Sequence, residues 1–139
     1  MELIANALQT VAENANVQFT DEVVGGCSSI LHRSGSGLIT LRGITNQCRA
    51  RFKAFFSANI AIPTGETVGP VSLAIAINGE QVAATTMIQT PAAVEEFANV
   101  ASAIYIDVPA NCCLTISVTN VGNIPVAVQN ANLIVERVA

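Results

Sequence analysis

The chain has 139 residues and a mass of 14.4 kDa, enough for one domain with a hydrophobic core. Hydrophobic residues make up 51% of it and charged residues only 12%, which excludes an intrinsically disordered chain. Ten acidic and six basic residues give a net charge of −4, which argues against a nucleic-acid-binding protein. No apolar run approaches the roughly 18 residues that a transmembrane helix needs, so no membrane partner is predicted.

The first segment has apolar residues at helical spacing. Leu3, Ile4, Leu8 and Val11 fall on or near one face of a helix over residues 2–14. Such a short helix is marginal alone and needs a partner to pack on. We therefore predict an N-terminal arm or short helix over residues 1–16, separate from a domain over 17–139. The segment lacks a signal-peptide pattern, so synthesis in a cytoplasm is expected.

From residue 17 onwards, apolar and polar residues alternate with the period of two that is typical of strands. Turn residues separate the strand candidates, and the Asn78-Gly79 pair predicts a tight hairpin. No second helical stretch follows. The sequence predicts a single all-β sandwich or jelly roll, with strands at 17–20, 28–32, 38–41, 49–62, 71–77, 82–88, 101–108, 114–119, 125–129 and 132–138.

The strand candidates at 71–77 and 114–119 carry small neutral residues on the face opposite their apolar residues. In a soluble monomer, charged residues are expected on such a face. Close approach of another subunit would explain this, so we predict a subunit interface there. The alternative is that these faces pack inside a two-sheet sandwich. Alternation also places Tyr105 on the face away from the core, so we include it. The interface candidates are Ser72, Ala74, Ala76, Tyr105, Thr115, Ser117 and Thr119.

Five of the six basic residues fall within 21 positions: Arg33, Arg42, Arg49, Arg51 and Lys53. This cluster indicates either a patch for an acidic protein surface or a solvated strand face that resists self-association.

The four cysteines, Cys27, Cys48, Cys112 and Cys113, lack the spacing of a zinc site, so buried free thiols are expected. The alternative, for an extracellular particle, is a disulfide bond between Cys27 and Cys48.

No combination of residues predicts catalysis. His32 is the only histidine, and its neighbours indicate a turn. Glu95 and Glu96 are adjacent in a loop, which indicates solvated charge more than a calcium or acid–base site. We therefore expect a non-enzyme with no catalytic, cofactor or metal site.

The order of the elements resembles a known family. Residues 51–60 (RFKAFFSANI), 71–79 (VSLAIAING), 104–108 (IYIDV), 114–120 (LTISVTN) and 131–138 (ANLIVERV) together are similar to the tumour-necrosis-factor/C1q-type jelly roll. Residues 40–43 (TLRG) with 48–52 (CRARF) resemble small proteins of phages and prophages of Gram-positive gut bacteria.

The resemblance implies a homotrimer and a structural phage virion protein. We expect a capsid decoration or head-fibre protein on the virion surface, made in the cytoplasm of a bacterial host. It would dock on the major capsid protein or another virion protein through Leu3, Ile4, Leu8 and Val11. The alternative is a trimeric receptor- or glycan-binding tip of a phage fibre or bacterial surface filament, acting through loops such as residues 90–99.

Overall fold

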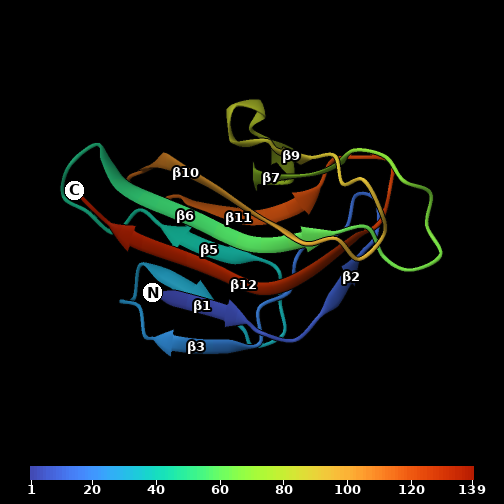
Figure 1. Cartoon of the computed structure of the whole chain (residues 1–139). Coiled ribbons are helices and arrows are strands. Elements are labelled where there is room, and N and C mark those ends of the chain that lie inside the picture. The colour runs from blue at the N-terminus through green and yellow to red at the C-terminus, as the bar shows by residue number, and fades with distance from the viewer.

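In the computed structural model, which describes residues 1–139, two antiparallel sheets pack face to face (Figure 1). Sheet A has the order β10-β6-β12-β1-β3, with β2 also paired to β12. Its strands are β1 (Glu2–Ala5), β2 (Gln9–Val11), β3 (Asp21–Val24), β6 (Arg49–Ala61), β10 (Ala98–Pro109) and β12 (Val126–Arg137).

Sheet B has the order β4-β5-β11-β7-β8, with β9 also paired to β7. Its strands are β4 (Ile30–His32), β5 (Ile39–Arg42), β7 (Val71–Ile77), β8 (Glu80–Gln81), β9 (Met87–Gln89) and β11 (Cys113–Asn120). The one helical element is the 3-10 turn η1 (Ala83–Thr85), and the chain holds no helix of the length and apolarity that crossing a membrane requires. The all-β sandwich predicted from the alternation is confirmed.

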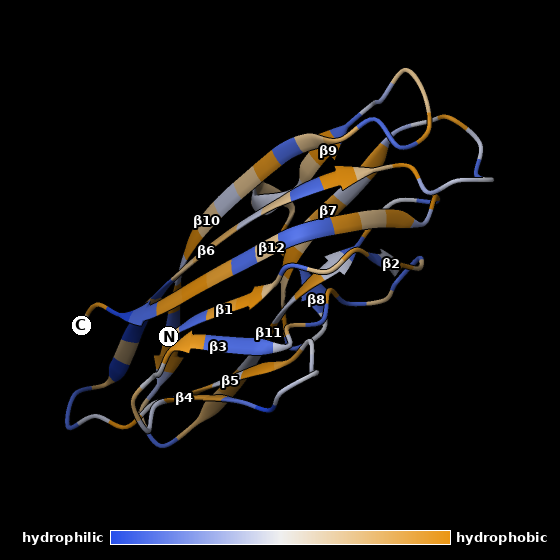
Figure 2. Ribbon diagram, turned by 60° about the horizontal axis from the view of Figure 1, so that its bottom comes forward, coloured by the Kyte–Doolittle hydropathy of each residue, from blue (hydrophilic) through white to orange (hydrophobic).

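The core lies between the sheets and follows the alternation of each strand, visible as changing colour along the strands in Figure 2. In β6 the residues Phe52, Ala54 and Phe56 are fully buried. The rings of Phe19 and Phe56 meet edge to face, with their centroids 6.3 Å apart. Because successive side chains point to opposite faces, the other half of β6 faces out of the sandwich.

The prediction of an N-terminal helix is wrong. Residues 2–11 form β1 and β2, and Leu3 of β1 lies opposite Leu133 of β12. The ammonium group of Met1 donates a hydrogen bond of 2.7 Å to the carbonyl of Val135. A segment this short gains more from the backbone partners of a sheet than from an isolated helix. It is therefore part of sheet A, not a segment that stands apart from the sandwich.

The hairpin at Asn78-Gly79 is confirmed: both residues have positive φ, at 52° and 83°, and Ile77 pairs with Glu80. The return strand is shorter than predicted, because η1 interrupts it. The hydroxyl of Thr85 accepts a 2.9 Å bond from Ile75 N and so replaces a strand partner. Residues 17–20 also form no strand.

Candidate functional site

The outer face of sheet A carries large apolar side chains that no part of the chain covers. Ala103 of β10 lies opposite Phe55 of β6, and Phe55 lies opposite Ile134 of β12. Phe55 and Ile134 are 37% and 38% exposed, and Tyr105, two residues along β10, is 64% exposed. We call Ala103, Phe55, Ile134 and Tyr105 the apolar band. The row of Ala103, Phe55 and Ile134 crosses three neighbouring strands, and Tyr105 lies in the next row of β10, opposite Lys53.

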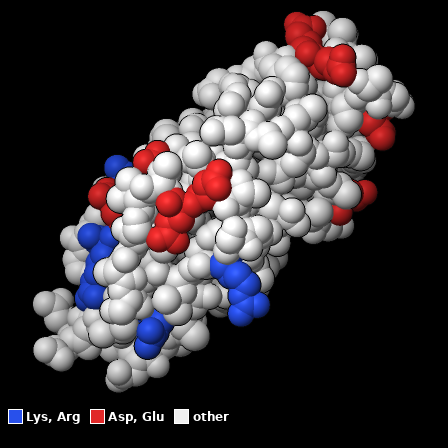
Figure 3. Space-filling view, turned by 90° about the horizontal axis from the view of Figure 1, so that it is seen from below, with Lys and Arg blue, Asp and Glu red and all other residues white.

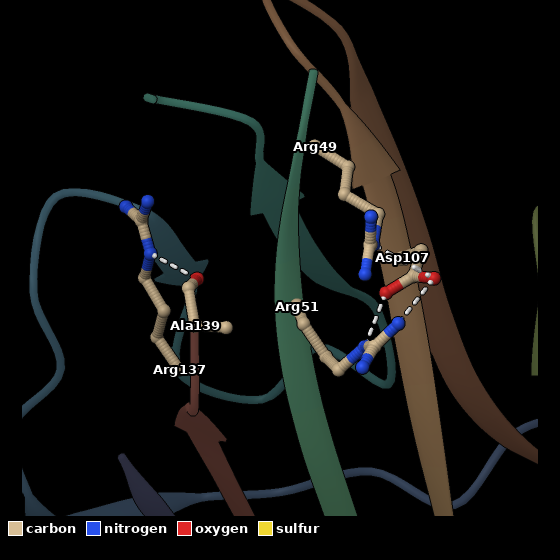
Figure 4. Close-up of polar contacts among 5 residues, drawn as sticks. All are labelled: Arg49, Arg51, Asp107, Arg137 and Ala139. Carbon is tan, nitrogen blue, oxygen red and sulfur yellow. Dashed lines mark hydrogen bonds and ion pairs between the residues drawn. The ribbon is translucent and has the colours of Figure 1, made fainter. Parts of the chain in front are cut away.

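Beside this band, two arginines share one carboxylate (Figure 4). Arg51 lies opposite Asp107 in the register of β6 and β10, and its Nε and Nη2 donate bonds of 2.8 and 3.2 Å to the two carboxylate oxygens. Arg49 Nε lies 3.2 Å from Asp107 Oδ2. We call Arg49, Arg51 and Asp107 the arginine cluster. It holds two positive charges against one negative charge.

The hydrogen bond from Arg51 lowers the pKa of the Asp107 carboxyl, and that contact raises the pKa of Arg51. All three side chains stay open to solvent, at 39% to 47% exposure, so water screens their attraction. The cluster is therefore a rigid polar feature on the surface more than a source of stability. Such bidentate pairs fix the direction of both side chains.

Arg137, which the sequence cluster did not include, lies near the same end of the molecule. Its Nη1 donates bonds to the carbonyl of Ile44 and the hydroxyl of Ser29, at 2.7 and 3.3 Å, and its Nε donates to Ala139 O at 3.1 Å. The face shown in Figure 3 carries its visible basic groups toward one end, whereas acidic groups lie at the opposite end, over the middle and also beside the basic groups. The charges are unevenly spread, although the chain carries a net charge of only −4.

The seven predicted interface residues do not form one surface. Ser72, Ala74, Ala76, Thr115, Ser117 and Thr119 line the outer face of β7 and β11 in sheet B, whereas Tyr105 faces out of sheet A. Ala74, Ala76 and Ser117 are already buried within the single chain. Because alternation shows only which residues of one strand share a face, it could not show that these strands belong to different sheets.

The four anchor candidates are also divided. Leu3 and Val11 are buried in the core, and Ile4 is half-buried on the outer face of sheet A, opposite Asn132. Leu8, in the link between β1 and β2, is 58% exposed. Only Leu8 therefore offers most of its side chain to another molecule.

His32 is a structural residue: its Nε2 lies 2.9 Å from the carbonyl of Ser36, and its ring meets Phe19 edge to face. All four cysteines are free but exposed, so the expectation of buried thiols is wrong. A hydrogen bond from the Ser29 backbone lowers the pKa of the Cys27 thiol. No group of three or more His, Cys, Asp or Glu side chains is arranged to hold a metal ion.

No family model and no curated protein matches this sequence. Solved structures match over nearly its whole length. The globular domain of zebrafish complement 1qA protein has a TM-score of 0.71 and 9% identity, over 99% of this chain and 95% of its own. The Eiger TNF of S. frugiperda has a TM-score of 0.67 and 10% identity, over 100% and 92%. These similarities establish the fold, which is the jelly roll of C1q and TNF domains.

Proposed function

We propose that this chain is a structural virion protein of a bacteriophage: a homotrimer that decorates the capsid and assembles through the outer face of sheet A. The observation that carries the assembly is the apolar band, in which Phe55 and Ile134 are exposed opposite each other and Tyr105 is exposed in the next row of β10. Exposed apolar surface that is continuous over several strands is typical of a protein–protein interface. The low charge of the chain, 12%, supports the same proposal.

The composition of this face suits an interface between copies. Tyrosine and arginine are enriched where protein interfaces hold most of their binding energy, and Tyr105 and Arg51 lie two positions apart in the register of β10 and β6. The apolar band would form the desolvated centre and the arginine cluster would form the polar rim. Formation of such an interface would remove mainly apolar atoms from water, which lowers the free energy.

The virion setting is supported by the resemblance of residues 40–43 and 48–52 to phage proteins. A repeated capsid lattice multiplies weak contacts, so a small trimer needs no extensive docking surface. Because residues 2–11 are strands of sheet A, docking does not use a free arm.

The solution mass tests the assembly. Light scattering on a size-exclusion column should give about 43 kDa, three times the chain mass of 14.4 kDa. A mass of one chain at all concentrations would overturn the trimer. Cosedimentation with purified phage heads that lack the protein tests the capsid role separately. A trimer that stays in the supernatant would retain the assembly and remove the decoration function, which would leave the receptor- or glycan-binding tip as the alternative.

A further inference from the structure

A pocket of about 300 Å³ opens at the end of the sandwich where β6 ends and β10 begins. Ala127 of β12 lies opposite both Ala61 and Thr10, so it forms the floor. The walls come from the β1–β2 link and from two loops. We call this the loop-end pocket, and its lining residues are Leu8, Thr10, Pro63, Thr64, Glu95, Phe97 and Ala127.

The two loops of this pocket are tied to each other and to the sheet. The hydroxyl of Thr64 donates a hydrogen bond to Glu95 Oε1. The loop of Thr64 closes as a turn, in which Glu66 N bonds to Pro63 O at 3.2 Å and Gly65 has a φ of 90°. The pocket wall is therefore preorganised, which lowers the entropy lost when a ligand binds.

Glu95 is held in place by its backbone as well as by its side chain. Its φ of 59° lies in the left-handed region, which is unfavourable for a residue with a Cβ. A hydrogen bond of 2.8 Å from Glu95 N to Ile62 O connects this conformation to the end of β6. One carboxylate oxygen accepts from Thr64, and the side chain is exposed, so the carboxylate has capacity to accept further bonds.

The same pocket has an apolar side. Phe97 is 41% exposed and Leu8 is 58% exposed, although both are large apolar residues next to a carboxylate. An aromatic ring, a fixed carboxylate and two threonine hydroxyls in one concave site are a typical mixture for a small polar ligand with an apolar face. A saccharide has both: its C–H face packs on a ring, and its hydroxyls donate to a carboxylate.

We propose that the loop-end pocket binds a neutral saccharide unit, with the sugar stacked on Phe97 and its hydroxyls donating to Glu95. Charge determines the choice among saccharides. The pocket lining contains no basic residue, and Glu96 adjoins it in sequence, so sialylated and sulfated sugars are repelled. This site goes beyond the structural role proposed above, because capsid decoration requires no sugar.

The test is an NMR titration of the full-length, ¹⁵N-labelled protein with methyl glycosides of glucose, galactose, mannose and N-acetylglucosamine. The methyl glycoside of N-acetylneuraminic acid is the anionic comparison. We expect saturable shifts of the Glu95 and Phe97 amides with at least one neutral sugar and none with the anionic sugar. Absence of saturable binding by all four neutral sugars overturns the proposal, as does a preference for the anionic sugar.

Two variants connect binding to the named residues. Phe97→Ala and Glu95→Gln should each raise the dissociation constant for the sugar about tenfold. This is the size expected for the loss of one stacking or charged contact. Glu96→Gln, which removes a charge outside the lining, is the matched control and should keep the affinity within about twofold. Unchanged affinity in both pocket variants overturns the site. The solution mass of each variant, measured in parallel, separates failure of sugar binding from failure of the trimer.

Discussion

Phe55 on β6 lies directly opposite Ile134 on β12, and both side chains face out of the sandwich. The next residue along β6, Phe56, is fully buried. Two adjacent aromatic residues of one strand therefore belong to different environments: one completes the core of the monomer, and the other is left exposed on sheet A. In the proposed trimer, the exposed Phe55 and Ile134 would contact another copy.

Replacing Phe55 with lysine should dissociate the assembly. The charge would lie in the centre of the apolar band, where a partner would have to desolvate it. We expect the light-scattering mass to fall to that of one chain, 14.4 kDa. Ile88→Lys is the matched control, since Ile88 is 64% exposed but lies on β9 of sheet B. An unchanged mass for Phe55→Lys would mean that copies do not meet on sheet A.

Asp107 predicts a pH dependence of stability. Its pKa is lowered in the folded state by Arg51, so its contribution is present above the ordinary aspartate pKa of about 3.9 and is lost as pH falls through the folded value. Wild type should therefore have a slightly higher Tm than Asp107→Asn near neutral pH, and the difference should shrink as the pH falls below the ordinary aspartate pKa. The difference should be small, because the group is exposed. A difference that grows on acidification would contradict this assignment.

The sequence alone predicts the long strands, but it does not predict which strands pair with one another. Alternation over residues 49–62 matches β6, and Asn78-Gly79 marks a hairpin that forms. Leu3, Ile4 and Val11 are compatible with a helical period, but β12 and β3 of sheet A provide hydrogen-bond partners that a short helix lacks. Only the partner strand β12, 130 residues away in the chain, decides between a helix and a strand for this segment.

The candidate surface depends even more on long-range pairing. The arginine cluster requires Arg51 to lie opposite Asp107, a separation of 56 residues that no local pattern specifies. The loop-end pocket likewise joins Thr64 to Glu95 across two loops. The sequence indicates only solvated loop charge at Glu95, and no local pattern connects this residue with Phe97 or Leu8. Strand register, set by the whole fold, brings these side chains together.

Deleting residues 1–11 should unfold the protein instead of only detaching it from a partner. The deletion removes Leu3, Ala5 and Val11 from the core and exposes the edge of β12. Burial of these side chains contributes roughly 1.5–3 kcal/mol for each large one, so loss of cooperative thermal unfolding is expected by circular dichroism. As a comparison, Leu8→Ser should leave the Tm nearly unchanged, because Leu8 is exposed. A truncated chain that unfolds cooperatively at the wild-type Tm would show that this segment is dispensable.

Gly43→Ala should disturb the end of the sandwich near the arginine cluster. A Cβ at this position would lie 2.1 Å from the carbonyl oxygen of Pro109, and backbone atoms cannot move aside as a flexible side chain does. Gly43 N also donates to Cys112 O, and its carbonyl accepts from Asn111 N, so the loop is held from both sides. We expect a clear drop in Tm. Gly35→Ala provides the comparison, since no atom lies within 4 Å of its Cβ position, although its φ of 84° adds some strain.

Asn120→Ala should be among the most destabilising single changes outside the aromatic core. The side chain is fully buried, and its Nδ2 donates to the carbonyls of Val11 and Ile124 at 3.0 and 2.9 Å. Its Oδ1 accepts from Gly122 N at 2.9 Å. One amide therefore connects β2 in sheet A with the turn after β11 in sheet B. Alanine cannot replace any of these bonds.

The expected loss follows from the groups that alanine leaves without a partner. A buried backbone group that loses its hydrogen bond is destabilised by about 1–3 kcal/mol, so Asn120→Ala should lower the unfolding free energy by about 3 kcal/mol in urea titrations. Asn59→Ala is the control, because its amide bonds only to Asn99 and Asn130 in exposed positions. It should change stability by less than about 0.5 kcal/mol. Equal losses for the two variants would show that the connection between the sheets does not depend on the Asn120 amide.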